Sequence, residues 1–542
     1  MVEQAQHDRA VEEPGTSSAA PVRLGAGGTA RLVAGVLAPM LAQGIIVRRP
    51  AVVRLLDRWQ GDDRAVRALQ RARARYGRGP LVLRIPGRSV ALLTGAQDAA
   101  RVLAGSPEPF APATTEKRAA LQHFQPGGVL ISDGAPRAAR RRWNEDVLQL
   151  DVPLHEQAAA IGAVAAEELA PLRRAGSWDW PTFTEAWARI TRRVTLGDGA
   201  RDDVGLTDEL ARLRGRANWA YLRRTDHDGR RRLLAAVQDH LDRAEPGSLA
   251  ATVTAAAGGE HGADLDLPSQ VAHWLFAWDA AGIATHRAAA LLAGHPEHAA
   301  AVRAEVAAAV PGRPDLPLLR ATVLESVRLW PTTLAVLRET TRPTDWGGRT
   351  APAGTTFVLV SSLLHRDDEQ LPEADRFVPR MWLDETAPAG TSASLRSMVP
   401  FSAGPARCPG RDLVLHTSSV VLAALLGPDE PVQTAGRSAP DTGPLPRTLD
   451  HTALRFALRP RPEASRGSGR IRLGGLQVSG TATMRGRRVM HGGDPVLDRV
   501  GEKGAGPAGA GRALLGDLVD TVVRLAPGAD ACGLTVQRAG AR

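Results

Sequence analysis

The loop at residues 401–411 combines residue types that can hold a reactive sulfur atom. It reads Phe-Ser-Ala-Gly-Pro-Ala-Arg-Cys-Pro-Gly-Arg, and a helix is predicted to begin at Pro409. Cys408 therefore precedes a helix N-terminus, where free N–H groups favour negative charge. Arg407 and Arg411 add positive charge beside it. These features predict a thiolate that is a metal ligand or a nucleophile, and the alternative is a buried, inert cysteine.

Two other segments place polar residues at helical spacing. Glu325 and Arg328 lie on one face of a predicted helix and can form an ion pair, which is usually a weak surface interaction. Gly282 and Thr285 interrupt a long apolar helix predicted over residues 270–293. The simplest account is close packing at the glycine and a hydroxyl bonded back to a main-chain carbonyl.

These segments, in this order, resemble the cytochrome P-450 superfamily. The loop matches its haem-binding signature of Phe401, Gly404, Cys408 and Gly410. The resemblance implies that Cys408 is the axial thiolate ligand of the iron in haem b. It also implies that Phe401 packs near the sulfur and that the two glycines permit a close approach to the haem. The position two before the cysteine, commonly Arg or His in the family, is Ala406.

The resemblance extends to the helical pairs. Glu325 and Arg328 match the family's Glu-x-x-Arg motif, which belongs to a buried ionic network behind the cysteine loop, and Arg380 is the expected third member. Gly282 and Thr285 match the oxygen-binding groove, so they are the expected catalytic residues.

The acid of that groove is missing from its expected position. Ala284 stands where the family has the acid. Asp279 lies five residues earlier, about 140° around the helix, so it is not expected to replace that acid.

Arginines match the family's contacts to the haem propionates. Arg137 and Arg141 open a predicted helix, and Arg338 follows the segment after Pro331. Guanidinium groups bind carboxylates through paired hydrogen bonds, which explains the residue type, although an arginine run is usually a solvated face. The family's substrate-facing segment supplies the expected apolar pocket residues Leu334, Val336 and Leu337.

The resemblance implies a haem-thiolate monooxygenase of the soluble bacterial type. It would use O2, a small apolar organic substrate, and electrons from a separate ferredoxin and ferredoxin reductase. Two alternatives remain open: a peroxide-driven peroxygenase with the same fold, suggested by Ala284, and a non-enzymatic haem-binding sensor. The sequence does not specify the substrate.

Composition restricts the class of protein. The 542 residues include 68 basic and 58 acidic side chains, a net charge of +10, and 43% hydrophobic residues, which is an ordinary globular balance. All basic residues except Lys117 and Lys503 are arginine, so the positive charge is a weak indication of nucleic-acid binding, and we expect none. Two cysteines exclude a disulfide framework and suit a reducing compartment.

The chain is predicted to be mainly α-helical with small β-sheets, as one large haem-binding domain with a C-terminal extension. We expect a flexible lead at residues 1–44, a cytochrome P-450 haem domain at 45–460, a Gly/Arg-rich linker at 461–511, and a helix–strand appendage at 512–542 that resembles a truncated GAF-type start. The apolar stretch at 32–47 is shorter than a membrane span and contains Pro39, which predicts a packed, kinked helix. We therefore expect a cytoplasmic protein with no membrane span.

Overall fold

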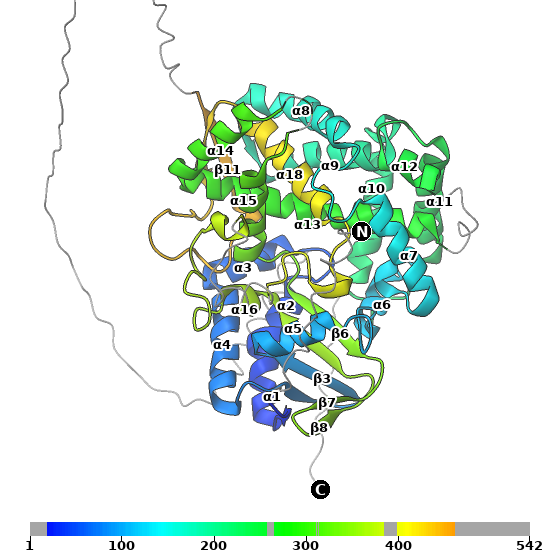
Figure 1. Cartoon of the computed structure of the whole chain (residues 1–542), viewed down its shortest axis with the longest axis vertical. Helices are drawn as coiled ribbons and strands as arrows, with labels where there is room; N and C mark the ends of the chain where they lie inside the picture. Colours follow the sequence, from blue (N-terminus) through cyan, green and yellow to red (C-terminus); the bar gives the residue numbers. More distant parts are fainter. Residues whose placement is uncertain (1–18, 257–264, 311, 313, 384–397, 461–542) are drawn as a thin grey trace, which may run out of the picture. The chain divides into compact units, whose positions relative to one another are not determined.

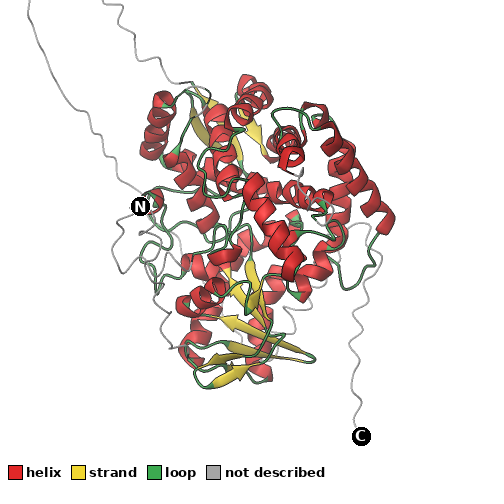
Figure 2. Ribbon diagram, turned by 45° about the vertical axis from the view of Figure 1, so that its right-hand side comes forward, coloured by secondary structure: helices red, strands yellow, loops and turns green. Residues whose placement is uncertain are grey.

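The computed structural model describes residues 19–256, 265–310, 312, 314–383 and 398–460. Helices dominate this part of the chain and the strands form three small sheets, as the sequence predicts. Figure 1 shows most of the helices in the upper part of the view and the largest sheet below them, with α1, α4 and α5 beside the sheet, and Figure 2 shows the strands in separate groups. The predicted linker and appendage, residues 461–542, lie outside the described residues.

The first half of the chain contains the helices from α1 to α12. They are α1 (Ala26–Leu32), η1 (Val33–Leu37), α2 (Ala38–Ala42), α3 (Pro50–Trp59), α4 (Gly61–Tyr76), α5 (Ala96–Ala104), α6 (Thr115–Leu121), η2 (Val129–Ile131), α7 (Gly134–Val147), α8 (Ala158–Ala175), α9 (Trp180–Leu196), η3 (Asp198–Ala200), α10 (Val204–Ala217), α11 (His227–Arg243) and α12 (Leu249–Ala256).

The helices of the second half begin with the longest one. They are α13 (Leu267–Gly294), α14 (Pro296–Ala308), α15 (Pro317–Leu329), α16 (Ser361–Arg366), η5 (Pro379–Trp382), η6 (Gly404–Ala406), α18 (Arg411–Leu426) and η7 (His451–Ala453). Helix α13 packs against α9, α11, α15 and α18, so it occupies the middle of the helical part.

The largest sheet has the strand order β1-β2-β3-β9-β6-β4. Its strands are β1 (Val22–Arg23), β2 (Leu81–Ile85), β3 (Arg88–Leu93), β4 (Phe110–Ala111), β6 (Ala335–Thr340) and β9 (Thr356–Val360). The sequence alternates over residues 81–94 and breaks at Pro86-Gly87, which predicts two strands joined by a tight turn, and the β2–β3 hairpin confirms this. The smaller sheets are β10 (Glu430–Ala435), β11 (Arg455–Arg459) and β5 (Ser177–Asp179), and β7 (Thr344–Trp346) with β8 (Arg349–Ala351).

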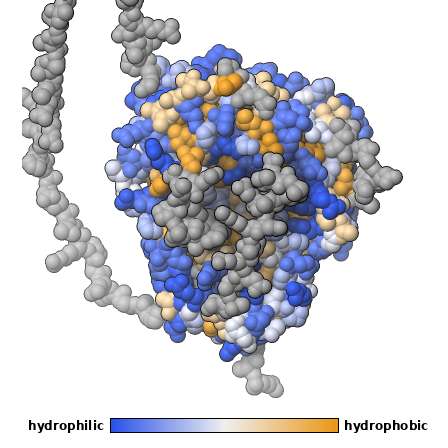
Figure 3. Space-filling view, in the orientation of Figure 1, coloured by the Kyte–Doolittle hydropathy of each residue, from blue (hydrophilic) through white to orange (hydrophobic). Residues whose placement is uncertain are grey.

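Hydrophobic residues fill both sides of the largest sheet, because side chains alternate along a strand. In β9, Val358 and Val360 join the cluster that also contains the N-terminal helices, whereas Phe357 and Leu359 join a cluster on the other face. A third and larger cluster occupies the helical part around α13. Figure 3 shows polar residues over much of the visible surface, with apolar residues exposed mainly over the helices in the upper half.

The flexible lead predicted at residues 1–44 is wrong for residues 22–42. That segment forms β1, α1, η1 and α2, and Leu32, Val36 and Met40 are buried against the sheet. Burial of these side chains compensates for the low helix propensity of the neighbouring glycines. The predicted kink is present as the π-helical turn η1 just before Pro39, whose ring and missing N–H disturb the preceding helical hydrogen bonds.

The apolar spacing over residues 50–76 predicts one helical segment, and the structure divides it into α3 and α4. Gln60 adopts a left-handed conformation between them, with φ of 48°. The side-chain Nε2 of Gln60 donates to the carbonyl of Thr448, and the side-chain Oε1 accepts from the main-chain N–H groups of Arg447 and Thr448. These contacts come from a segment far away in the sequence, so local periodicity could not reveal the break.

Replacing Leu32 with alanine is expected to lower the free energy of unfolding by about 2–5 kcal/mol, because it leaves a cavity beneath the sheet. Leu32 is 4% exposed. The measurement is chemical unfolding followed by circular dichroism.

The matched control is Leu41→Ala in the adjoining helix, where Leu41 is 59% exposed. This change should alter the free energy of unfolding by less than about 0.5 kcal/mol. Equal effects of the two substitutions would contradict the packing of the N-terminal segment against the sheet.

Candidate cofactor site

The loop that carries Cys408 is held by its own main chain and by a buried histidine. The Cys408 N–H donates to the Phe401 carbonyl at 2.8 Å, and Nε2 of His365 accepts from the N–H of Val399 at 2.8 Å. Ser402 and Gly404 both have positive φ, of 62° and 67°, which gives the loop its sharp turns. These hydrogen bonds and turns fix the position of the Cys408 sulfur in the loop.

The helix after the loop begins two residues later than the sequence predicts. Gly410 is the N-cap and Arg411 the first helical residue, so Pro409 belongs to the loop. The N–H of Gly410 points at the sulfur and, with the positive charge of Arg141, lowers the thiol pKa, but burial outweighs both and raises it. Burial thus acts on the free thiol in the direction opposite to the N–H groups and positive charges of the loop, and the predicted thiolate stays a prediction.

The two loop glycines lie in different surroundings. A Cβ atom at Gly404 would lie 2.2 Å from the Leu103 carbonyl oxygen, so this glycine permits close approach to helix α5. At Gly410 an added Cβ would meet only a Leu148 methyl at 3.7 Å, an ordinary contact. Phe401 is half-buried and packs against the main hydrophobic cluster.

Glu325 and Arg328 form a bidentate ion pair inside the protein. Arg328 Nε and Nη2 donate to the carboxylate of Glu325 at 2.6 and 2.8 Å, and both side chains are 0% exposed. The surface pairing that local sequence favours is therefore wrong, and the buried pair that the resemblance implies is present.

Main-chain groups complete this network. Arg328 also donates to the carbonyls of Ala374 and Arg376, at 3.0 and 2.5 Å. Glu325 accepts from the N–H of Val378 at 2.7 Å and from Nε1 of Trp382 at 2.9 Å. Every strong hydrogen-bonding position of the pair is used, which offsets the cost of burying two charges.

The prediction that Arg380 is the third member of the network is wrong. Arg380 is exposed. It lies in the short helix η5, whose turn directs Trp382 towards Glu325 and leaves Arg380 at the surface.

Arg137, Arg141 and Arg338 come from α7 and β6 and are all buried, with at most 9% exposure. Arg338 Nη2 donates to Ser402 Oγ at 3.0 Å, and Arg141 Nη1 donates to the Arg407 carbonyl at 2.6 Å. Two of the three predicted arginines are thus tied to the loop that carries Cys408.

Positive charge is poorly compensated in this cluster. Glu145 pairs with Arg141 at 2.6 Å, but in the described part of the chain no carboxylate forms an ion pair with Arg137 or Arg338. Arg137 Nε and Arg141 Nη2 are buried and lack hydrogen-bond partners. Burial, with repulsion from Arg137, lowers the pKa of Arg338 to about 10. Such a cluster is costly unless anionic groups bind to it.

Lys117 is a fourth cation of this cluster, and sequence reasoning missed it. Its Nζ donates to the carbonyls of Pro112 and Leu337 at 2.8 and 3.1 Å. Burial and the charges of Arg338 and Arg137 lower its pKa well below the ordinary value. The sequence offered one indication that Lys117 is unusual: every other Lys or Arg position before residue 503 is arginine.

Comparisons with known proteins agree on one superfamily. A family model described as cytochrome P450 matches residues 282–427, which contain Glu325, Arg328 and Cys408. The family model, the curated relatives and the solved structures all support the cytochrome P-450 superfamily.

Curated cytochrome P-450 relatives match part of the chain. Cyclooctat-9-en-7-ol 5-monooxygenase from Streptomyces melanosporofaciens is 34% identical over 142 residues, which are 25% of this chain and 30% of the relative. Cyclooctatin synthase from the same organism is 32% identical over 190 residues, 34% of this chain and 37% of the relative. The matches thus span about a third of the relatives' lengths.

Solved structures share the cytochrome P-450 fold over a larger part of the chain. A zebrafish cytochrome P-450 with abiraterone has a TM-score of 0.57 at 19% identity and covers 73% of this chain and 98% of its own. Retinoic acid-bound cyanobacterial CYP120A1 has a TM-score of 0.56 at 18% identity and covers 72% of this chain and 93% of its own. These similarities establish the fold.

Gly282 and Thr285 both make local packing contacts in helix α13. A Cβ atom at Gly282 would lie 2.9 Å from Nε1 of Trp187, so this glycine permits the close approach of helix α9. The Thr285 hydroxyl, fully buried, donates to the Ala281 carbonyl at 2.8 Å. The roles in oxygen binding that the resemblance implies for the two residues stay predictions.

The residues around the expected acid have other partners. The Ala284 carbonyl accepts from Ser326 Oγ at 2.8 Å, which joins α13 to α15. Asp279 is half exposed and forms an ion pair with the buried Arg214 of α10.

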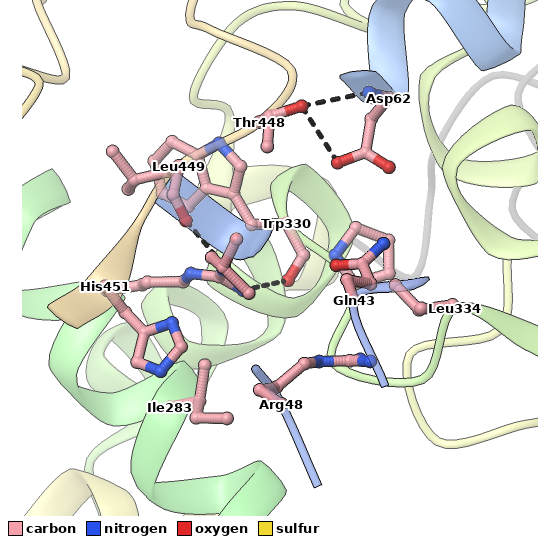
Figure 4. Close-up of a pocket in the computed structure, with 12 residues that line it drawn as sticks. Gln43, Arg48, Asp62, Ile283, Trp330, Leu334, Thr448, Leu449 and His451 are labelled. Carbon is pink, nitrogen blue, oxygen red and sulfur yellow. Dashed lines mark hydrogen bonds between the residues drawn. The ribbon is translucent and has the colours of Figure 1, made fainter. Parts of the chain in front are cut away.

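The three expected pocket residues do not share one cavity. Strand alternation places Val336 in the cluster on one face of the sheet and Leu337 in the cluster on the other. Leu334 lines a cavity between α13 and the N-terminal helices (Figure 4). Among the described residues, no helix has the length and apolar character needed to cross a membrane.

Replacing Glu325 with glutamine is expected to lower the free energy of unfolding by about 3–5 kcal/mol, because the buried Arg328 loses its counter-charge. Unfolding in urea, with the m-value checked against the parent protein, measures the effect.

Glu185→Gln is the matched control. Glu185 is 64% exposed and pairs with Arg189 on the surface of α9, so its loss should cost under about 1 kcal/mol. A similarly small effect at Glu325 would contradict the central role of the buried pair.

Proposed function

We propose that this protein is a haem-thiolate monooxygenase that holds haem b through Cys408. One observation carries the proposal: Arg338, a buried cation with no ion pair among the described residues, is hydrogen-bonded to the loop that carries the cysteine, and the same cluster contains unused buried donors at Arg137 Nε and Arg141 Nη2. A haem supplies two carboxylates and a cationic iron, which match the cations and the thiol respectively.

The cofactor's carboxylates would occupy the interior cation cluster. Arg137, Arg338 and Lys117 would hold the propionates, while Arg141 is partly neutralised by Glu145. Unused donors at Arg137 Nε and Arg141 Nη2 support this assignment, because buried polar groups normally have partners.

Other residues of the chain would position the sulfur. The Cys408 N–H bond to Phe401 fixes the loop, and the Gly410 N–H stabilises negative charge on the sulfur. The Glu325–Arg328 network holds residues 374–382 against α15. When bound, a haem iron with a thiolate ligand supplies the activation of O2.

The reaction proposed is insertion of one oxygen atom of O2 into a C–H bond of an organic substrate. The second oxygen atom leaves as water and takes up two electrons and two protons. The electrons would come from a ferredoxin and its reductase. The name of the relative cyclooctat-9-en-7-ol 5-monooxygenase supports an oxygen insertion of this class.

A peroxygenase is the second candidate, since the structure engages Thr285 and the space at Gly282 in packing. In that reaction hydrogen peroxide supplies the oxygen atom and both electrons. Product formed with O2 and a reductase system supports the monooxygenase, whereas product formed with peroxide alone supports the peroxygenase.

Cys408→Ala is expected to abolish the red-shifted thiolate-type Soret band of the reduced, CO-bound protein, because the axial sulfur is lost. The absorption spectrum of the purified protein measures this directly, and circular dichroism verifies the fold. A thiolate-type band that persists in Cys408→Ala would exclude Cys408 as the ligand.

Lys117→Met is expected to speed the transfer of haem to a competing apoprotein by about tenfold or more, since hydrogen bonds to charged groups contribute about 1.5–3 kcal/mol. Circular dichroism and chemical unfolding of the haem-free variant verify that the faster transfer does not come from loss of the fold. Lys117→Arg is the control that keeps the charge. An unchanged transfer rate would contradict the proposed contact to the propionates.

A further inference from the structure

His365 connects two parts of the candidate cofactor site that lie apart in the sequence. It is near the end of α16, which packs against α15, and it is 1% exposed. One of its contacts reaches the helix that carries the buried ion pair, and another reaches the loop that carries Cys408. The two contacts use different atoms of the residue.

The first contact is made by the main chain of His365. Nη1 of Arg328 donates to the His365 carbonyl at 3.4 Å, while Nε and Nη2 of the same guanidinium hold the carboxylate of Glu325. His365 is therefore attached to the buried ion pair.

The second contact is made by the imidazole. Nε2 accepts from the N–H of Val399 at 2.8 Å, so this nitrogen carries no proton and the ring is neutral, with its proton on Nδ1. Burial and the charge of Arg328 lower the pKa of His365 to about 3, which keeps Nε2 an acceptor at neutral pH. Val399 is 3% exposed, so loss of this acceptor would leave a buried N–H unsatisfied.

Val399 begins the part of the loop that turns towards the cysteine. Its carbonyl accepts from the N–H of Ser402 at 3.1 Å, and the next turn brings the Cys408 N–H within 2.8 Å of the Phe401 carbonyl. Ser402 has positive φ, so this turn has a restricted geometry. A displacement of Val399 would therefore be passed to the turn at Ser402 and from there to the cysteine.

Arginine side chains also bind the loop, and their contacts are of another kind. Arg338 donates to Ser402 Oγ, and Arg141 donates to the Arg407 carbonyl. Both arginines belong to the cation cluster that the proposed function assigns to the cofactor. His365 is neutral and acts on a main-chain N–H, so its effect on the loop can be tested without changing the charge beside the cofactor.

We propose that His365 is a positioning residue for Cys408. Its imidazole holds Val399, and the loop that begins there then keeps the sulfur where it can remain bound to iron as a thiolate. The inference rests on the proposed function, because that function makes Cys408 the ligand of the haem. It adds α16 to the elements that determine the loop and joins the loop to Arg328 through a single residue.

Glutamine and asparagine at position 365 give a matched pair of variants. The side-chain oxygen of glutamine can reach the position of Nε2, whereas that of the shorter asparagine cannot. We expect His365→Asn to speed the loss of the thiolate-type Soret band of the reduced, CO-bound protein in dilute urea by about tenfold or more, because a buried N–H loses its acceptor. His365→Gln should keep the parent rate, and equal acceleration by both variants would overturn the proposal.

His240→Asn is the control for a general loss of stability. His240 is 3% exposed on α11, and its Nε2 lies 3.0 Å from the carboxylate of Asp203. This change should lower the free energy of unfolding but leave the rate of band loss near that of the parent. If His240→Asn speeds band loss as much as His365→Asn does, the role of His365 is general stability and the proposal is wrong.

Hydrogen exchange of the Val399 amide measures the contact itself, in the purified full-length protein with or without haem. His365→Asn should speed this exchange by about tenfold or more, while the Leu415 amide inside α18 keeps its protection. Unchanged exchange at Val399 would overturn the contact. If His365→Asn does not fold, parent-like exchange at Val399 in His365→Gln supports the proposal and fast exchange overturns it.

The two readouts separate the inference from the proposed function. A parent protein without the thiolate-type band would overturn the proposed function, and exchange at Val399 would still decide whether His365 holds the loop. A parent protein with the band, and with the same rate of band loss in His365→Asn, would leave the proposed function intact and overturn the positioning role.

Discussion

The buried pair of Glu325 and Arg328 is the interaction on which the arrangement around the cysteine depends. Both side chains are fully inside the protein, and their remaining hydrogen bonds reach four different groups in residues 374–382. Helix α15, which carries the pair, packs against both α13 and α18. One charged pair thus joins an irregular segment to the helices that flank the cysteine loop, and its cost is offset only because every donor and acceptor is satisfied.

The same interior also contains cations that form no ion pair among the described residues. Arg137, Arg338 and Lys117 lie near the cysteine loop, and Arg48 and Arg287 line the cavity beside α13. Lack of an ion pair does not by itself indicate a ligand, because the buried Arg192 is satisfied by the carbonyls of Ala200 and Arg201. The unused buried donors at Arg137 Nε and Arg141 Nη2 are the feature that favours a bound anion beside the cysteine loop.

Sequence alone could predict the features that depend on neighbouring residues. The β2–β3 hairpin follows from alternation around a turn, and the Cys408 loop follows from a compact motif. Features that depend on distant contacts were predicted wrongly or missed. Trp187 from another helix packs against Gly282, the N-terminal segment is ordered by the sheet beneath it, and η5 turns Arg380 outward. No local pattern encodes these contacts.

Ala406 stands where the motif commonly has a basic residue, and the proposed haem site contains a cation from another element. The loop lacks the basic residue expected two positions before Cys408, yet the cluster contains Lys117 from α6, which the motif does not include. Lys117 donates to the carbonyl of Leu337, the residue before Arg338, so the two cations are positioned by one strand. The carboxylates of a cofactor require positive charge close to the position that they occupy. Any element that reaches the place can supply that charge, so a substitution inside a motif is best judged against the charges that surround it in space.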